Sequence, residues 1–267
     1  MNRRLRAMAP ISDGAWSAID EEAARTLRSL LAGRRLVDFD GPLGWAAAAV
    51  ATGRRQPLAI SVPGVEAATR GVRPLVELRA EATLPRLELE LVDRGGSDPD
   101  LAPVIAAARQ LARAEDRLIF DGDEAAGIAG IASASPHDPI ALDEDYTTFP
   151  RLVARAVATL RGAAVDGPYG VALGPRCYAG VMEATEHGGY PVLEHLRLMT
   201  GGPVVWAPAL EGTVVLSLRG GDFELHVGED LGIGYVRHDD ATVTVVLDES
   251  LTFSNHTPEA AVALRDG

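Results

Sequence analysis

The sequence predicts a mixed α+β fold, and three observations lead to that prediction. Apolar residues recur at three- and four-residue steps in several segments, short alternating strands fill the last third of the chain, and a Pro- and Gly-punctuated stretch at residues 53–80 is extended. The chain has 267 residues, of which 47% are hydrophobic and 24% are charged. It can therefore bury a sizeable core, as one large domain or two modest ones.

The first predicted element is an amphipathic helix over residues 12–33. Its apolar face is formed by Trp16, Ile19, Ala23, Leu27 and Leu30. Ser12 is a favourable N-cap, and Gly33 is a typical helix stop. The helix leads into a turn-rich stretch at residues 41–45, where we expect Trp45 to anchor the chain to a core.

Residues 53–80 contain few helix signals and two apolar runs, at 58–62 and 75–79. This pattern predicts a long two-stranded arm. An isolated hairpin is marginal in water, so the arm is expected to lie on another surface. A neighbouring subunit is the obvious candidate.

A second long helix is predicted over residues 98–122, because Asp98 followed by Pro99 is a typical helix opening and a long apolar stripe follows. We expect this helix to be the spine of the main core. The Ser-, Pro- and Asp-rich residues 133–145 then predict a crossing between domains.

The rest of the chain alternates helices with short strands. The predicted helices are residues 150–160, a segment from Pro175, and 192–198, and the predicted strands are 169–173, 204–206, 214–216, 223–227, 242–246 and 251–253. Gly232-Ile233-Gly234 is interpreted as a turn between strands. It lacks the third glycine of a dinucleotide-binding motif.

Composition excludes several functions. Thirty-eight acidic residues against 25 basic ones give a net charge of −13, which argues against nucleic-acid or anionic-membrane partners. The sequence contains no lysine, so Schiff-base lysines, Walker-type phosphate loops and the kinase strand lysine are excluded. No stretch approaches the roughly 18 apolar residues of a membrane span, and no secretory signal is expected. The single Cys177 fits a reducing compartment, so the expected location is the cytoplasm.

No catalytic or metal-binding pattern stands out. There is no Gly-x-Ser-x-Gly motif, and Cys177 is interpreted as a small core residue. Glu183 and His187 could share a metal on a continuous helix, but the Gly-rich loop after His187 favours ordinary surface polarity. The acidic clusters at 20–22 and 143–145 are typical of solvated faces. These features suit an assembly protein better than an enzyme.

A series of short segments, in order along the chain, is similar to the encapsulins. The segments are residues 5–10 with Trp16 and Ile19, then 33–38, 41–45, 114–120, 166–169, 189–191, 206–210, 219–223, 228–235 and 249–253. They span almost the whole chain with consistent spacing. The sequence therefore resembles a shell protein of the encapsulin family, also described as linocin- or bacteriocin-type.

The resemblance implies the tailed-phage major capsid fold of the Hong Kong 97 type. It implies a helix and connector at residues 1–48 that pack on a peripheral domain formed by residues 81–132 and 220–267. Residues 49–80 would be the extended loop and residues 133–219 the axial domain. Such subunits assemble into a closed icosahedral shell, are not enzymes, and enclose a cargo protein such as a ferritin-like protein or a dye-decolourising peroxidase.

The resemblance also implies an apolar groove that binds a C-terminal cargo peptide. Its residues would be Leu27, Leu31, Arg34, Leu36, Asp38, Leu231 and Ile233. An extended peptide could place aliphatic side chains against the leucines while Arg34 and Asp38 bond its polar groups. The competing interpretation is that Leu27 and Leu31 pack within the subunit and that Arg34 pairs with Asp38.

A pore at the five-fold axis is implied by the loop formed by Glu186, His187, Gly188, Gly189 and Tyr190. The family position that can hold a flavin-binding tryptophan corresponds to Leu87, so no cofactor is expected. Two other functions stay open at this point. A phage or prophage capsid protein would share the fold, and a protease or bacteriocin activity is disfavoured because no nucleophile and base pattern is present.

Overall fold

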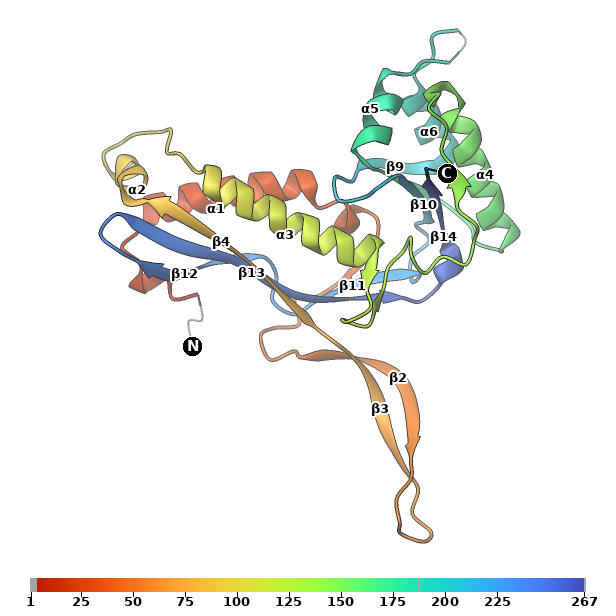
Figure 1. Ribbon diagram of the computed structural model, residues 1–267, viewed down its shortest axis with the longest axis horizontal. Helices are drawn as coiled ribbons and strands as arrows, with labels where there is room; N and C mark the ends of the chain where they lie inside the picture. Colours follow the sequence, from red (N-terminus) through yellow and green to blue (C-terminus); the bar gives the residue numbers. More distant parts are fainter. Residues whose placement is uncertain (1–3, 187, 267) are drawn as a thin grey trace.

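In the computed structural model, which describes residues 4–186 and 188–266, a five-stranded sheet covered by helices forms the first lobe (Figure 1). Helix α3 packs on strands β4 and β13, and α1 packs on α3. The strands are β1 (Asp38–Asp40), β4 (Val76–Pro85), β11 (Phe223–Val227), β12 (Gly232–His238) and β13 (Thr242–Asn255); the helices are α1 (Asp13–Leu30), α2 (Arg86–Asp93) and α3 (Ala102–Phe120).

Strand β13 organises this sheet. Antiparallel β4 pairs along one edge from Val76 opposite Leu251 to Pro85 opposite Thr242. Strands β12 and β11 follow one another along the opposite edge. The two strands predicted at 242–246 and 251–253 are therefore one strand, because the polar residues between them are buried and paired and do not form a turn.

The second lobe is built on a five-stranded sheet of order β7-β14-β10-β8-β9, with α4, α5 and α6 packed around it (Figure 1). The strands are β7 (Ile140–Ala141), β8 (Tyr169–Leu173), β9 (Gly201–Trp206), β10 (Thr213–Ser217) and β14 (Ala261–Arg265); the helices are α4 (Phe149–Gly162), α5 (Pro175–Glu183) and α6 (Val192–Thr200). The segments predicted in this region match these elements closely. Strand β14 was not predicted, and it carries the C-terminal segment from the first sheet into the second.

A hairpin of β2 (Ala49–Leu58) and β3 (Ala67–Pro74) projects from the first lobe (Figure 1). Almost all of its residues are exposed or half-buried. The predicted arm is present, but its boundaries were wrong. The apolar run 58–62 lies at the tip, and residues 76–79 already belong to β4 in the sheet. A small hairpin, β5 (Gly122–Asp123) with β6 (Ile128–Ala129), follows α3.

The ends of the long helices test the capping predictions. Ser12 caps α1, because its Oγ accepts a hydrogen bond from the Ala15 N–H at 3.2 Å. Helix α3 begins at Ala102 and not at Asp98, and Leu101 at its N-cap makes no side-chain bond. Short 3₁₀ turns link other elements: η1 (Arg6–Met8), η2 (Gly33–Arg35), η3 (Tyr146–Thr148) and η4 (Pro258–Ala260).

Three further differences concern exposure and pairing. Residues 232–234 form the start of β12 and not a turn, because Ile233 pairs with Leu247 of β13. Trp45 does not anchor a core within the subunit, since 56% of its surface is exposed. Helix α2 and residues 81–85 of β4 were not predicted, although β4 alternates polar and apolar residues as a half-buried strand does.

The buried apolar residues form two clusters. One fills the space between α1, α3 and strands β4, β12 and β13, and includes Ile19, Leu27 and Leu31. The other fills the second lobe and extends to Leu36, Phe120 and Phe253. Across the described parts of the chain, no helix has the length and apolar character needed to cross a membrane.

Candidate functional site

A cavity of about 820 Å³ opens between α1 and the start of β12. We refer to this cavity as the groove. Its apolar wall combines Leu27 of α1 and Leu31 at the C-cap of that helix with Ile233 of β12, Leu247 of β13 and Leu231, which precedes β12. Its other lining residues are Arg4, Arg6, Asp20, Ala23, Ala24, Arg28, Arg34, Arg35, Asp230 and Gly232. An apolar wall bordered by arginines can hold aliphatic side chains and bond polar backbone or acidic groups.

The residues before α1 line one side of the groove and hydrogen-bond to its two walls. The Arg6 guanidinium donates two hydrogen bonds to the Asp20 carboxylate, at 2.7 and 2.5 Å, and a third to the Ile233 carbonyl. It also lies 4.3 Å from the ring centroid of Trp16. The Tyr235 N–H donates to the Arg4 carbonyl at 2.8 Å. These contacts tie residues 4–6 to both α1 and β12.

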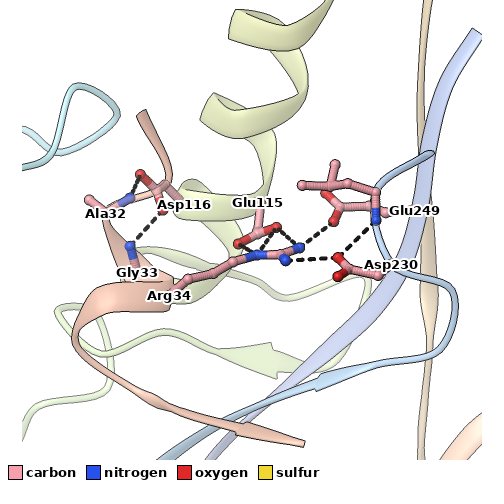
Figure 2. A network of polar contacts seen from close by, with 8 residues as sticks. Ala32, Gly33, Arg34, Glu115, Asp116, Asp230 and Glu249 are labelled. Carbon is pink, nitrogen blue, oxygen red and sulfur yellow. Dashed lines mark hydrogen bonds and ion pairs between the residues drawn. The ribbon is translucent and has the colours of Figure 1, made fainter. Parts of the chain in front are cut away.

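An ion-pair network centred on Arg34 adjoins the groove (Figure 2), and Arg34 and Asp230 of this network line it. The Arg34 guanidinium donates to Glu115 of α3 at 2.7 Å, to Glu249 of β13 at 2.9 Å and to Asp230 at 2.8 Å. The side chains of Glu115 and Glu249 have no exposed surface, whereas that of Asp230 is 45% exposed. Arg34 therefore connects α3, β13 and the loop between β11 and β12 at one point.

Burial sets the electrostatics of this network. Desolvation opposes the charge of Arg34, but its bonds to Glu115 and Asp230 and the charge of Glu249 outweigh that effect and raise its pKa. Desolvation raises the pKa of Glu249 well above its ordinary value, and the nearby charge of Glu115 adds to the effect. The Oε1 atom of Glu249 is buried without a hydrogen-bond partner. Glu249 is therefore the carboxyl in this cluster that burial drives toward its neutral form.

Asp116 holds the turn that positions Arg34. Its two carboxylate oxygens accept hydrogen bonds from the N–H groups of Gly33 at 2.8 Å and Ala32 at 3.1 Å (Figure 2). Desolvation raises the pKa of Asp116 to about 7, although these two bonds lower it in part. The side chain thus satisfies backbone donors that α1 and its following turn leave unpaired.

The structure brings together five of the seven predicted groove residues. Leu27, Leu31, Arg34, Leu231 and Ile233 all line the groove. Leu36 is buried in the core of the second lobe, and Asp38 accepts a hydrogen bond from the Gly221 N–H at 2.5 Å. Both line a separate hollow of about 200 Å³.

The competing interpretation of these residues holds only in part. Leu27 and Leu31 are each 8% exposed, so most of their surface is packed within the subunit, and the remainder faces the groove. Arg34 does not pair with Asp38, because its guanidinium is used by Glu115, Glu249 and Asp230. Arg34 therefore lines the groove while its guanidinium is paired within the subunit.

The predicted pore loop connects α5 to α6 at the tip of the second lobe (Figure 1). His187 lies outside the described residues. Glu186 bonds Nδ1 of His195 at 2.7 Å, and its N–H donates to the Tyr190 carbonyl. Gly188 and Gly189 have positive φ and are exposed, as is Tyr190 at 45%.

The other sequence candidates occupy ordinary positions. Cys177 is 1% exposed in the core of the second lobe. Asp145 caps η3 through the Thr147 N–H, and Asp20 belongs to the wall of the groove. Leu87 is 69% exposed on α2. Glu183, for which ordinary surface polarity was favoured over a shared metal with His187, is exposed at the end of α5, and His187 lies outside the described residues.

Arg34 was predicted as a groove residue, but the sequence did not identify the carboxyl groups around it, Glu115, Asp116, Asp230 and Glu249. A signal was present, because Glu115 and Asp116 are charged residues within the apolar stripe of a helix expected to be the core spine. Charged residues are almost never fully buried unless they are paired. Arg34, the partner of Glu115, lies 81 residues away in sequence, and Glu249, which Arg34 also bonds, lies 134 residues away, so only the fold could identify this network.

Comparison with known proteins identifies the family. A family model described as "Encapsulating protein for peroxidase" matches residues 1–252. The chain is 49% identical to a type 1 encapsulin shell protein of Rhodospirillum rubrum, across 99% of this chain and 97% of that protein. The chain belongs to the encapsulin shell protein family. A type 1 encapsulin shell protein of Mycolicibacterium paratuberculosis is 48% identical over 99% of both chains.

Solved structures show the same fold. A virus-like particle from Pyrococcus furiosus matches with a TM-score of 0.65 at 15% identity, covering 93% of this chain and 98% of that one. The capsid of Myoviridae phage XM1 matches with a TM-score of 0.56 at 13% identity, covering 88% and 90%. The encapsulin chain therefore has the Hong Kong 97-type capsid fold expected from the resemblance.

These findings decide between the functions left open by the sequence. The relatives at 43–49% identity are named as encapsulin shell proteins, whereas the phage capsids are related in fold alone. This encapsulin is a self-assembling shell subunit, with a structural and not a catalytic role, and its primary partner is further copies of itself.

Proposed function

We propose that the groove between α1 and β12 binds a targeting peptide at the C-terminus of a cargo protein, and so recruits that protein into a closed icosahedral shell. The supporting observation is the combination of a cavity of about 820 Å³, a wall of five aliphatic side chains, and a border of arginines. Because the Arg6 and Arg4 contacts occupy the backbone of β12 at Ile233 and Tyr235, the peptide is held chiefly through its side chains.

The cargo is proposed to be a peroxidase of the dye-decolourising type or a ferritin-like protein. The description of the matching family, an encapsulating protein for peroxidase, favours the first. We place the shell in the cytoplasm, in agreement with the single buried cysteine. We propose that the shell encloses no nucleic acid and does not bind a membrane.

We propose that the first lobe is the peripheral domain and the second lobe the axial domain. Residues 81–132 and 220–257 supply most of the first, with residues 1–48 packed on it, and residues 133–219 supply the second. Strand β14 of the C-terminal segment belongs with the axial lobe, because it pairs with β7 and β10. Residues 49–75 form the extended loop.

The loop formed by Glu186, His187, Gly188, Gly189 and Tyr190 is proposed to narrow a pore where axial domains meet. Its position at the tip of that lobe supports the proposal (Figure 1). Repeated copies of Glu186 would give the pore a negative charge.

Co-expression tests the groove. A fluorescent protein with a Gly-, Ser- and Leu-rich C-terminal tail is expected to co-purify with shells on size exclusion, and the same protein without the tail is not. Ala24→Phe fills the groove from an exposed position on α1 and is expected to abolish loading while shells still form. Ser17→Phe adds the same ring outside the groove and should load normally. Equal loading of both variants would show that the peptide binds elsewhere.

A further inference from the structure

Two histidines and a glutamate converge where the chain leaves the first sheet for the second. Glu224 and His226 are two residues apart on β11, so their side chains point to the same face of the sheet. His256 directly follows β13, in the crossover through η4 to β14. One ligand-type atom from each of the three residues lies within 4.8 Å of the others.

The spacing of these atoms suits a small divalent metal ion. The Oε2 atom of Glu224 lies 3.5 Å from Nε2 of His226 and 3.5 Å from Nε2 of His256. Tetrahedral zinc with bonds of about 2.0–2.1 Å separates neighbouring ligand atoms by about 3.3 Å. The three side chains therefore need only small movements to surround such an ion.

The surroundings of His226 hold its ring as a metal ligand requires. Its Nδ1 lies 2.9 Å from a carboxylate oxygen of Asp40 on β1, and its Nε2 lies 3.0 Å from the Ser254 hydroxyl. Asp40 can only accept when ionised, so Nδ1 carries the proton and Nε2 presents its lone pair toward the cluster. A histidine bonded to a carboxylate through its other nitrogen is the usual arrangement behind a metal-bound imidazole.

We propose that Glu224, His226 and His256 form a binding site for a zinc-type divalent cation. The metal replaces the Ser254 hydroxyl as the partner of the His226 lone pair, and a water completes the coordination. His226 is only 6% exposed, whereas Glu224 and His256 are 35% and 50% exposed, so the ion can enter from solvent. This site is separate from the groove and from the pore loop.

Binding at this site would fix the crossover between the two lobes. His256 belongs to the connection between β13 and β14, and the other two ligands belong to β11. The metal would therefore cross-link the start of that connection to strand β11 of the first sheet. Because the ion binds the folded subunit, saturation raises the unfolding temperature of the shell.

Zinc titration of chelator-treated, assembled shells tests the site by calorimetry. Wild-type shells are expected to bind one zinc ion per subunit. His256→Ala and Glu224→Gln remove exposed ligands, and each is expected to weaken binding by more than about 100-fold. Asp40→Asn alters only the partner of His226 and should weaken binding by about 10–100-fold.

His238→Ala is the matched control, because His238 is exposed on β12 and contacts Tyr235 instead of the cluster. It should bind zinc as the wild type does. Electron microscopy of each variant checks that shells have formed. The proposal is overturned by wild-type shells that lack stoichiometric binding, or by His256→Ala and Glu224→Gln shells that keep the wild-type affinity.

Discussion

The guanidinium of Arg34 lies 2.7 Å from the carboxylate of Glu115, a side chain with no exposed surface. The pair joins the turn after α1 to the C-terminal half of α3 (Figure 2), and Arg34 also lines the groove. Arg34 also bonds Glu249 of β13 and Asp230, so a single cation holds three carboxyl groups from three segments. The shape of the groove therefore depends on this cation.

Replacing Arg34 by Met is expected to destabilise the subunit by about 3–5 kcal/mol, because Glu115 and Glu249 would remain buried without their cation. Thermal unfolding of purified shells measures the effect. Arg35→Met is the control, since Arg35 is exposed at the adjacent position. A similar, small effect for both variants would contradict the assigned role of Arg34.

Glu249→Gln tests the charge state of the buried carboxyl. Because the pKa of Glu249 is raised in the folded subunit, the folded state holds a proton that the unfolded chain releases above about pH 4.5. The contribution of Glu249 to stability is therefore greatest at low pH and is lost as pH rises toward its folded pKa. Glutamine does not titrate, and it can still accept a bond from Arg34.

As pH rises from 5 to 8, we expect the unfolding temperature of Glu249→Gln shells to increase relative to that of wild-type shells. Glu183→Gln, on an exposed position of α5, should run parallel to the wild type over the same range. A constant difference between Glu249→Gln and wild type across this range would mean that Glu249 does not take up a proton on folding.

The fold was largely predictable because its main elements have local signals. Ser12 and the apolar face of α1 mark that helix without reference to the rest of the chain. Strand β13 was predicted as two strands, because Asp248 and Glu249 are polar residues of the kind that form turns, and their buried partners are not evident from the sequence. Residues such as Leu36 and Asp38 lie next to Arg34 in sequence, yet the chain turns at η2 and carries them to another surface.

Gly33 is required where α1 ends, because there is no room for a side chain. A Cβ atom at this position would lie 2.5 Å from Cδ1 of Ile119 and 3.2 Å from Oδ1 of Asp116. Gly33→Ala is expected to destabilise the subunit by about 1–3 kcal/mol through overpacking. Gly162→Ala is the control: its Cβ meets no atom within 4 Å at the end of α4, and it should stabilise by up to about 1 kcal/mol. Thermal unfolding compares the two, and equal shifts would contradict the packing argument.

The projecting hairpin should be required for assembly. Leu58, Ile60, Val62 and Val65 are 42–55% exposed near its tip, far from either core, and apolar side chains gathered in this way indicate a contact surface. We expect this surface to contact a neighbouring subunit of the shell. The double variant Ile60→Asp with Val62→Asp is therefore expected to shift the protein from shells to small oligomers on size exclusion and in electron micrographs. Gln56→Asp adds a charge to an exposed polar position of β2 and should leave shells intact. Shells of normal size from the double variant would mean that the tip does not contact a neighbour through these residues.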